Sequence, residues 1–200
     1  MRNEGILIVV SGFSGAGKGT LMKRLVEEYD GYSLSISATT REPRPGEEDG
    51  REYFFLSREQ FEKRIADHAL IEHAEYCGNY YGTPKDYVER ELAAGRDVIL
   101  EIEIQGALKI KEQSPDALLL FVSTPDAAEL RRRLSGRGTD TAEVIQKRLG
   151  RAAKEAEGIE AYDYIVINDD LETCVRELHG IIAAAHHAPG RDEAVIKKMR

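Results

Sequence analysis

The stretch from Gly12 to Thr20 carries the residue types that bind phosphate in nucleotide-binding proteins. Gly12, Gly17 and Lys18 follow the spacing of a phosphate-binding loop. In such a loop the backbone N–H groups surround phosphate oxygens, and the lysine reaches the β- and γ-phosphates. The next position, where a hydroxyl normally meets Mg²⁺, is Gly19. Because Mg²⁺ readily keeps several waters, we expect the site to bind a nucleotide without that hydroxyl. Thr20 is no direct substitute, since one helical step rotates a side chain by roughly 100°.

Two further stretches carry groups that could hold a second phosphorylated ligand. Arg41 and Arg44 flank a proline in an irregular segment, and arginine binds phosphate through two parallel N–H donors. Taken alone, this segment also fits an exposed polar loop. Residues 70–88 combine the carboxylate of Glu72 with Tyr80, Tyr81 and Thr83. Half-buried tyrosines and a helix start at Thr83-Pro84 are the structural alternative.

Two acidic residues follow the buried apolar run that begins at Asp97. Glu101 and Glu103 alternate with apolar residues there. A carboxylate at the end of a strand near a phosphate loop is the arrangement that serves Mg²⁺ in many such proteins. A pair of exposed charges at a strand end is the alternative.

A basic cluster runs from Arg131 to Arg151, where seven basic side chains stand against two acidic ones. This excess of five positive charges suits a small phosphorylated ligand, although a charge run is more often a solvated helix face. The full chain of 200 residues has a net charge of −8, which argues against general nucleic-acid binding.

Strand-length apolar runs alternate with helical patterns, which predicts an α/β fold with a mainly parallel sheet. We expect strands at 5–10, 32–37, 97–104, 116–122 and 162–168. Helices are expected from Lys18 to Tyr29, from a capping box at Ser57 and Gln60 through His68, from Thr124-Pro125 onward, and from Leu171 to Ala185. The tail after His187 is expected to be peripheral or disordered.

The N-terminus lacks a secretory pattern, no apolar run reaches membrane-spanning length, and Cys77 and Cys174 lie far apart, so we expect a cytoplasmic protein with reduced thiols.

Taken together, these stretches resemble the guanylate kinase family from about Gly5 to about Ala185. The resemblance is specific in "TTREPRPGEEDGREYFF", "GNYYGTP", "LEIEIQGA", "RLSGRGTDTAEVIQKRL" and "YIVINDDL". It implies a P-loop parallel sheet flanked by helices, with a core at about 5–33, 90–128 and 158–185. It also implies an inserted GMP-binding region at about 34–89, a helical lid at about 129–157, and a tail at 186–200.

The resemblance implies transfer of the γ-phosphoryl of ATP to GMP, giving ADP and GDP, in purine nucleotide metabolism and GMP recycling. ATP would be bound by Gly12, Ser14, Gly15, Ala16, Gly17, Lys18, Gly19 and Thr20, with Asn168 near the adenine. The GMP phosphate would be held by Arg41, Arg44, Tyr53 and Tyr81, and the guanine edge by Ser37, Glu72, Thr83 and Glu103. Lys18, Arg41 and the lid arginines Arg137 and Arg148 would act in catalysis, and Glu101 would orient Mg²⁺ through water.

Two alternatives are open at this point. One is a non-catalytic interaction module of the same fold, but such modules have lost phosphate-loop residues, and Lys18 and both lid arginines are present here. The other is a kinase for AMP or UMP. This alternative is disfavoured by the segments "TTREPRPGE" and "GNYYGTP". We expect no nucleic-acid or membrane partner. The sequence leaves open a monomer or a homo-oligomer and the use of dGMP.

Overall fold

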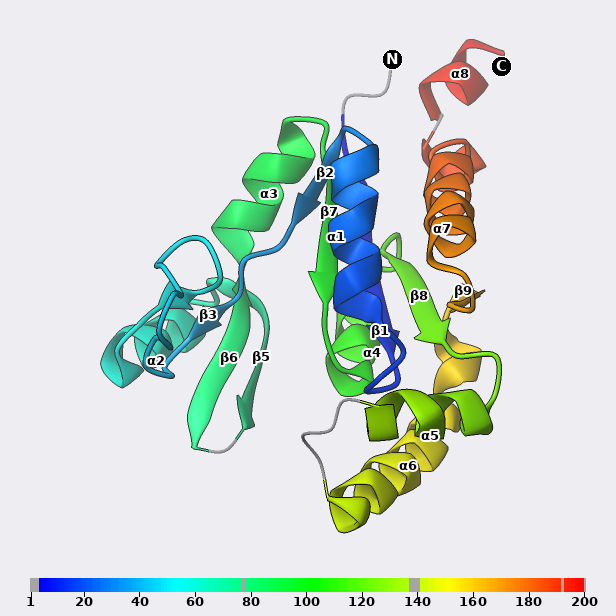
Figure 1. The fold of residues 1–200 in the computed structure, drawn as a ribbon. Coiled ribbons are helices and arrows are strands. Elements are labelled where there is room, and N and C mark those ends of the chain that lie inside the picture. The colour runs from blue at the N-terminus through cyan, green and yellow to red at the C-terminus, as the bar shows by residue number, and fades with distance from the viewer. Residues whose placement is uncertain (1–3, 77, 137–140, 192, 200) are drawn as a thin grey trace. The chain divides into compact units, whose positions relative to one another are not determined.

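The computed structural model describes residues 4–76, 78–136, 141–191 and 193–199 (Figure 1). The chain forms two compact units. The first contains Met1–Val10 and Gly31–Ala117, and the second contains Ser11–Asp30 and Leu118–Arg200.

Parallel strands form the centre of the first unit. Strand β1 (Leu7–Gly12) pairs with β7 (Asp97–Glu101) from Leu7↔Val98 to Val10↔Glu101, and β2 (Tyr32–Leu34) pairs with the other edge of β7. The apolar residues of β1 and β7 are almost wholly buried, as expected for strands covered on both faces. Helices α3 (Lys85–Ala93) and α4 (Ile104–Gln113) flank β7 in the sequence. The predicted α/β class is confirmed.

The same unit holds a second, smaller sheet. Its strand order is β4-β3-β6-β5, with β3 (Ala38–Thr39), β4 (Phe54–Phe55), β5 (Leu70–Tyr76) and β6 (Asn79–Pro84). Strands β5 and β6 are antiparallel, and their pairing shifts register between Leu70 and His73. Helix α2 (Arg58–Ala66) packs against β5 and begins with the predicted capping box of Ser57 and Gln60. This sheet was not predicted from the sequence, because β3 and β4 have only two residues each and the longer β5 and β6 carry no regular alternation.

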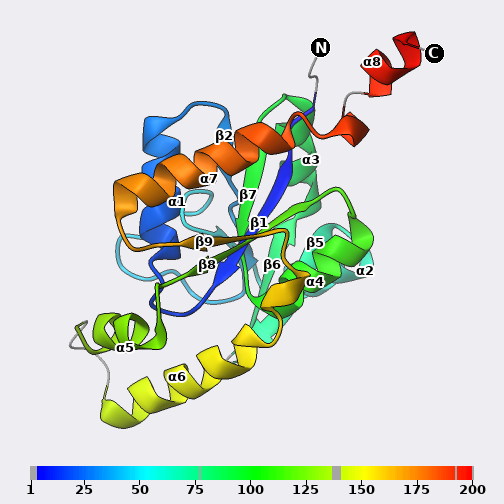
Figure 2. The same cartoon turned by 90° about the vertical axis from the view of Figure 1, so that its right-hand side faces the viewer.

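The second unit contains the helices that follow the phosphate loop and the last two strands. Helix α1 (Lys18–Glu28) lies beside α7 (Leu171–Ala185), as Figure 2 shows, and Arg24 forms an ion pair with Glu172. Strand β8 (Leu118–Ser123) pairs in parallel with β9 (Tyr164–Ile167). Helix α5 (Ala127–Gly136) packs against α6 (Ala142–Ala156) (Figure 1). Their shared cluster of Leu130, Leu134 and Ala152 also receives Phe13 of the phosphate loop.

Several predicted boundaries were wrong. The strand expected over 97–104 ends at Glu101, because α4 begins at Ile104 with Glu103 as its N-cap. The helix expected from Thr124-Pro125 begins at Ala127, where Asp126 accepts a hydrogen bond from the Glu129 amide.

Two other segments end earlier than expected. The second strand stops at Leu34, and the helix after Ser57 stops at Ala66, just before His68 with its φ of 52°. The tail contains a short 3-10 turn (η2, Pro189–Arg191) and helix α8 (Glu193–Lys198), and another 3-10 turn (η1, Ile159–Ala161) precedes β9. None of the helices in the described part of the chain combines the length and the apolar composition needed to cross a bilayer.

Candidate active site

The Glu72 carboxylate is placed by an irregularity in the β5–β6 hairpin. Pairing runs from His73↔Gly82 to Leu70↔Pro84, so Ile71 and Glu72 together face Thr83. An extra residue of this kind bends a strand and redirects a side chain. Thr83 is fully buried, and its hydroxyl donates a 2.8 Å hydrogen bond to Glu72 Oε1.

Close backbone packing holds this irregularity in place. A Cβ on Gly82 would lie 2.7 Å from the Glu72 carbonyl oxygen, so only glycine fits there. On the other side, Glu72 Oε2 lies 3.6 Å from the position that a Cβ on Gly106 would take, in the first turn of α4. The carboxylate is therefore enclosed between the hairpin and α4.

Burial raises the pKa of Glu72 above its ordinary value. The Thr83 hydrogen bond and the positive charge of Lys109 oppose this shift without cancelling it. In the described part of the chain, Thr83 donates to this carboxylate, which could accept further hydrogen bonds from a ligand with adjacent N–H groups.

A polar cavity of about 330 Å³ opens in the same unit. Predicted residues Ser37, Tyr53, Thr83 and Glu101 line it, together with Ser35, Glu52, Leu100 and Ile102, which the sequence reading did not single out. A cavity of this size lies at the small end of the range for ligand sites. Of the predicted guanine-reading residues, Glu103 is exposed at the N-cap of α4.

Arg41 lies near other residues that were predicted to bind the GMP phosphate. Its guanidinium lies 5.4 Å from the centre of the Tyr53 ring, and that ring lies 6.2 Å from the ring of Tyr81. Arg41 Nη2 donates to both carboxylate oxygens of Glu47 at 2.9 Å. The backbone N–H of Arg44 donates to the same carboxylate at 2.8 Å. Glu47 was missed because nothing in a loop sequence marks which acidic residue will fold back onto an arginine.

The phosphate loop closes tightly before α1. The Ala16 N–H donates to the Phe13 carbonyl at 3.0 Å, and Gly15 and Gly17 have φ values of 99° and 89°. Glycine adopts this left-handed conformation at little cost. Lys18 Nζ donates to the Gly12 carbonyl at 2.7 Å and to the Phe13 carbonyl at 3.3 Å. The lysine ammonium thus lies on the loop itself, and Gly19 and Thr20 are exposed in the first turn of α1.

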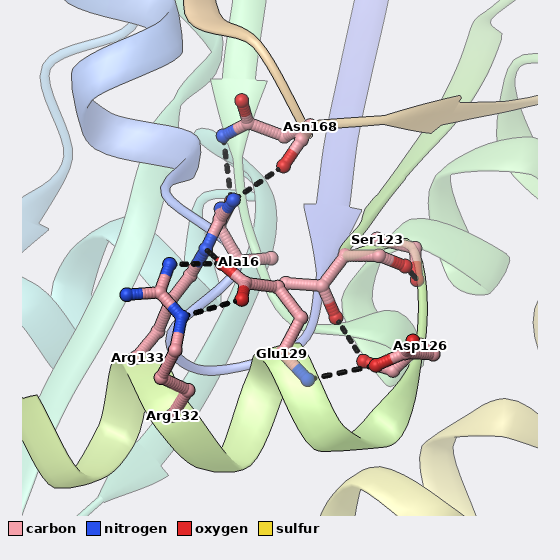
Figure 3. A network of polar contacts seen from close by, with 8 residues as sticks. Ala16, Ser123, Asp126, Glu129, Arg132, Arg133 and Asn168 are labelled. Carbon is pink, nitrogen blue, oxygen red and sulfur yellow. Dashed lines mark hydrogen bonds and ion pairs between the residues drawn. The ribbon is translucent and has the colours of Figure 1, made fainter.

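Asn168 contacts the phosphate loop directly. Its side-chain amide donates to the Ala16 carbonyl at 2.7 Å (Figure 3). Arg133 of α5 joins the same network, with Nη2 2.8 Å from the Asn168 carbonyl. Arg133 belongs to the basic cluster of the sequence, and its contact with the loop was not predicted. Its spacing of four residues from Glu129 was the available signal, because such a pair fixes an arginine on a helix.

The structure describes only one of the two predicted lid arginines. Arg137 lies outside the described residues, and Arg148 is half-buried in α6. The predicted excess of positive charge is partly neutralised by acidic residues just outside the counted window. Glu129 pairs with Arg132 and Arg133, and Glu155 pairs with Arg151. Hydrogen bonds from Arg132 and Arg133 hold the pKa of Glu129 at about 2.

Comparison with known proteins gives consistent matches. A family model described as guanylate kinase matches residues 4–185. A guanylate kinase of Desulfitobacterium hafniense (strain Y51) is 52% identical over 183 residues, covering 92% of each chain. A guanylate kinase of Latilactobacillus sakei subsp. sakei (strain 23K) is 47% identical over 200 residues, covering 100% of this chain and 98% of the relative. The crystal structure of guanylate kinase from Anaplasma phagocytophilum has a TM-score of 0.75 and 32% identity, covering 96% of this chain and 91% of that one.

Proposed function

The chain belongs to the guanylate kinase family and is an ATP:GMP phosphotransferase, and we propose that one set of the residues described above binds GMP and another set binds ATP. The observation that carries the assignment of residues is the half-buried Glu72 carboxylate, whose pKa is raised and which accepts a hydrogen bond from Thr83.

Glu72 is proposed to select guanine. Guanine presents N1–H and an exocyclic amine as adjacent donors, and one carboxylate can accept from both. Adenine presents an unprotonated N1 and no amine beside it, so AMP would leave the buried carboxylate unpaired. Sites that lose a buried partner in this way discriminate by roughly 10⁴ or more. Ser37 would donate its hydroxyl hydrogen to guanine O6, Thr83 would hold the Glu72 carboxylate toward the base, and Glu103 would complete the contacts to the base.

Arg41, Arg44, Tyr53 and Tyr81 are proposed to hold the GMP phosphate. Arg41 already lies among the two tyrosine rings, and its guanidinium geometry suits bidentate binding of phosphate. Glu47 would keep the guanidinium oriented before GMP arrives, since one charged pair fixes a side chain that otherwise has many rotamers.

The phosphate loop is proposed to bind ATP through the amides of residues 12–20 and the Lys18 ammonium. Helix α1 begins directly after the loop, so its N-terminus adds positive potential at the same place. Arg137 and Arg148 are proposed to stabilise the transferring phosphoryl group, for which positioning and charge neutralisation matter more than a strong base. Closure of 129–157 as a lid stays a prediction.

Mg²⁺ is proposed as the cofactor that accompanies ATP. The described residues contain no group of three or more His, Cys, Asp or Glu side chains arranged to hold a metal ion. Mg²⁺ does not require such a group, because it can be bound mainly by phosphate oxygens and water. When bound, Mg²⁺ would neutralise charge on the β- and γ-phosphates. Glu101, at the carboxyl end of β7, would accept hydrogen bonds from the waters of the ion.

A coupled assay of ADP release with GMP, dGMP, AMP and UMP tests the proposal. We expect kcat/KM for GMP to exceed that for AMP by roughly 10⁴. The Glu72→Gln variant should lose most of this ratio, while KM for ATP is unchanged. A ratio that survives this substitution would assign the selection of guanine to other residues.

A further inference from the structure

The carbonyl oxygen of Ala16, inside the phosphate loop, accepts hydrogen bonds from two side chains that are distant in sequence. Asn168 Nδ2 lies 2.7 Å away and Arg133 Nη1 lies 3.4 Å away (Figure 3). Ala16 is fully buried, and Asn168 is only 5% exposed. The Asn168 donor is therefore buried with the loop backbone, and the Arg133 side chain is 22% exposed.

Arg133 is fixed at each of its three nitrogens. Nε donates to Glu129 Oε1 at 2.6 Å, Nη2 donates to the Asn168 carbonyl at 2.8 Å, and Nη1 reaches Ala16. One guanidinium thus connects α5, the segment after β9 and the phosphate loop. A lysine could not reproduce this, because its ammonium is a single point on a flexible stem.

This network determines which way the peptide between Ala16 and Gly17 faces. The described chain has no cis peptide bonds, so the Gly17 N–H points away from the Ala16 carbonyl and its two donors. Gly17 is free to adopt other backbone conformations unless this peptide is held. The fit at Gly17 is also close, since a Cβ there would lie 2.7 Å from Asn168 Nδ2.

We propose that Arg133 is a positioning residue for the ATP site. Together with Asn168, it holds the Ala16–Gly17 peptide so that the Gly17 N–H is directed at the phosphates of ATP. The inference rests on the proposed function, in which this loop binds ATP. It also gives Asn168 a role in shaping the loop, beyond the position near adenine expected from the sequence.

Arg132 provides a matched control for Arg133. It is the neighbouring residue on α5 and donates to the same Glu129 carboxylate at 2.7 Å through both Nε and Nη2. Its side chain is 74% exposed, and both of these hydrogen bonds go to Glu129. Arg132→Met removes a positive charge and an ion pair of Glu129, but it leaves the bonds to Ala16 in place.

The test compares Arg133→Met, Arg133→Lys and Arg132→Met by steady-state kinetics with each substrate varied. We expect both Arg133 variants to raise KM for ATP about tenfold, the effect of losing one charge-assisted hydrogen bond, with KM for GMP within about twofold of the parent. Arg132→Met should leave both constants unchanged. If Arg133→Lys behaved like the parent, charge alone would account for Arg133 and the positioning role would be wrong.

Asn168→Ala and the Asn168→Ala/Arg133→Met double variant keep the proposal testable if one variant is unstable. Because both side chains support one carbonyl, the double variant should raise KM for ATP by less than the product of the single effects. The amide resonance of Gly17 should move in Arg133→Met but not in Arg132→Met.

The outcomes separate this inference from the proposed function. If the parent enzyme phosphorylates GMP and Arg133→Met matches Arg132→Met, only the positioning role fails. If the parent enzyme prefers another monophosphate while KM for ATP responds as expected, the positioning role stands and the assignment of guanine fails.

Discussion

Thr83 donates its hydroxyl hydrogen to Glu72 across the β5–β6 bulge, with 2.8 Å between Oγ1 and Oε1. Burial nevertheless raises the pKa of the carboxyl group, so its ionised form is less well solvated in the folded protein than in the unfolded chain. The pair therefore costs stability until a ligand supplies further donors.

This relationship predicts the behaviour of Glu72→Gln. A folded-state pKa above the unfolded value means that ionisation opposes folding, and this penalty is complete only above the folded-state pKa. The neutral glutamine avoids this penalty, so Tm should not fall, while kcat/KM for GMP should fall by at least about 100-fold. Thermal unfolding and kinetics on one preparation check both. A lower Tm with an unchanged GMP-to-AMP ratio would make Glu72 a structural residue.

Glu47→Gln is expected to weaken GMP binding through Arg41. The substitution removes the charge that fixes the guanidinium, so KM for GMP should rise about tenfold and KM for ATP should not change. Glu48→Gln is the control, since Glu48 pairs with Arg51 instead. A lower KM for GMP would show that Glu47 competes with the phosphate rather than orienting Arg41.

Removal of Mg²⁺ should abolish phosphoryl transfer even though Gly19 provides no hydroxyl. Activity in excess chelator is expected to be negligible, and Glu101→Gln should raise the Mg²⁺ concentration that gives half-maximal rate. Titration of Mg²⁺ at fixed ATP measures this. Equal titration curves for the parent and the variant would remove Glu101 from the metal site.

Arg148→Ala should lower kcat by about 100-fold or more while changing KM for GMP by less than about threefold, because stabilisation of the transition state affects kcat. Lys147→Ala is the control, because Lys147 is the neighbour of Arg148 and is exposed on the same helix. Small, equal effects in the two variants would indicate a solvated helix face.

The contacts of Glu91 are expected to make an acid-sensitive contribution to stability that is separate from activity. Hydrogen bonds from Arg96 at 2.6 Å and Ser33 at 2.8 Å lower its pKa to about 2. A depressed pKa stabilises the fold above the unfolded value, near 4.5, and this stabilisation is lost as pH falls toward about 2. Glu91→Gln should therefore lower Tm at pH 7, and the difference in Tm from the parent should shrink below about pH 4.5. A difference independent of pH would exclude the ion pair as its source.

The sequence predicted the elements that depend on local patterns. Leu171–Ala185 and the capping box at Ser57 were correct because periodicity and capping are properties of neighbouring residues. The bulge at Glu72 and the fold-back of Glu47 onto Arg41 were not predictable, since each depends on contacts made after folding. Arg133 was visible only as one of several arginines, because its role depends on the Ala16 carbonyl, 117 positions earlier.

Gly12 has a further meaning for telling active relatives from inactive ones. It has a φ of 153°, and a Cβ there would lie 2.1 Å from the Val122 carbonyl oxygen, so the strand packing itself demands glycine at this position. A relative that had abandoned catalysis would still need this glycine in order to fold. Lys18 is different, because its proposed role is to bind the phosphates of ATP and not to permit the packing of the strand. Loss of Lys18, with Gly12 intact, is therefore the substitution that would mark a relative as a pseudoenzyme.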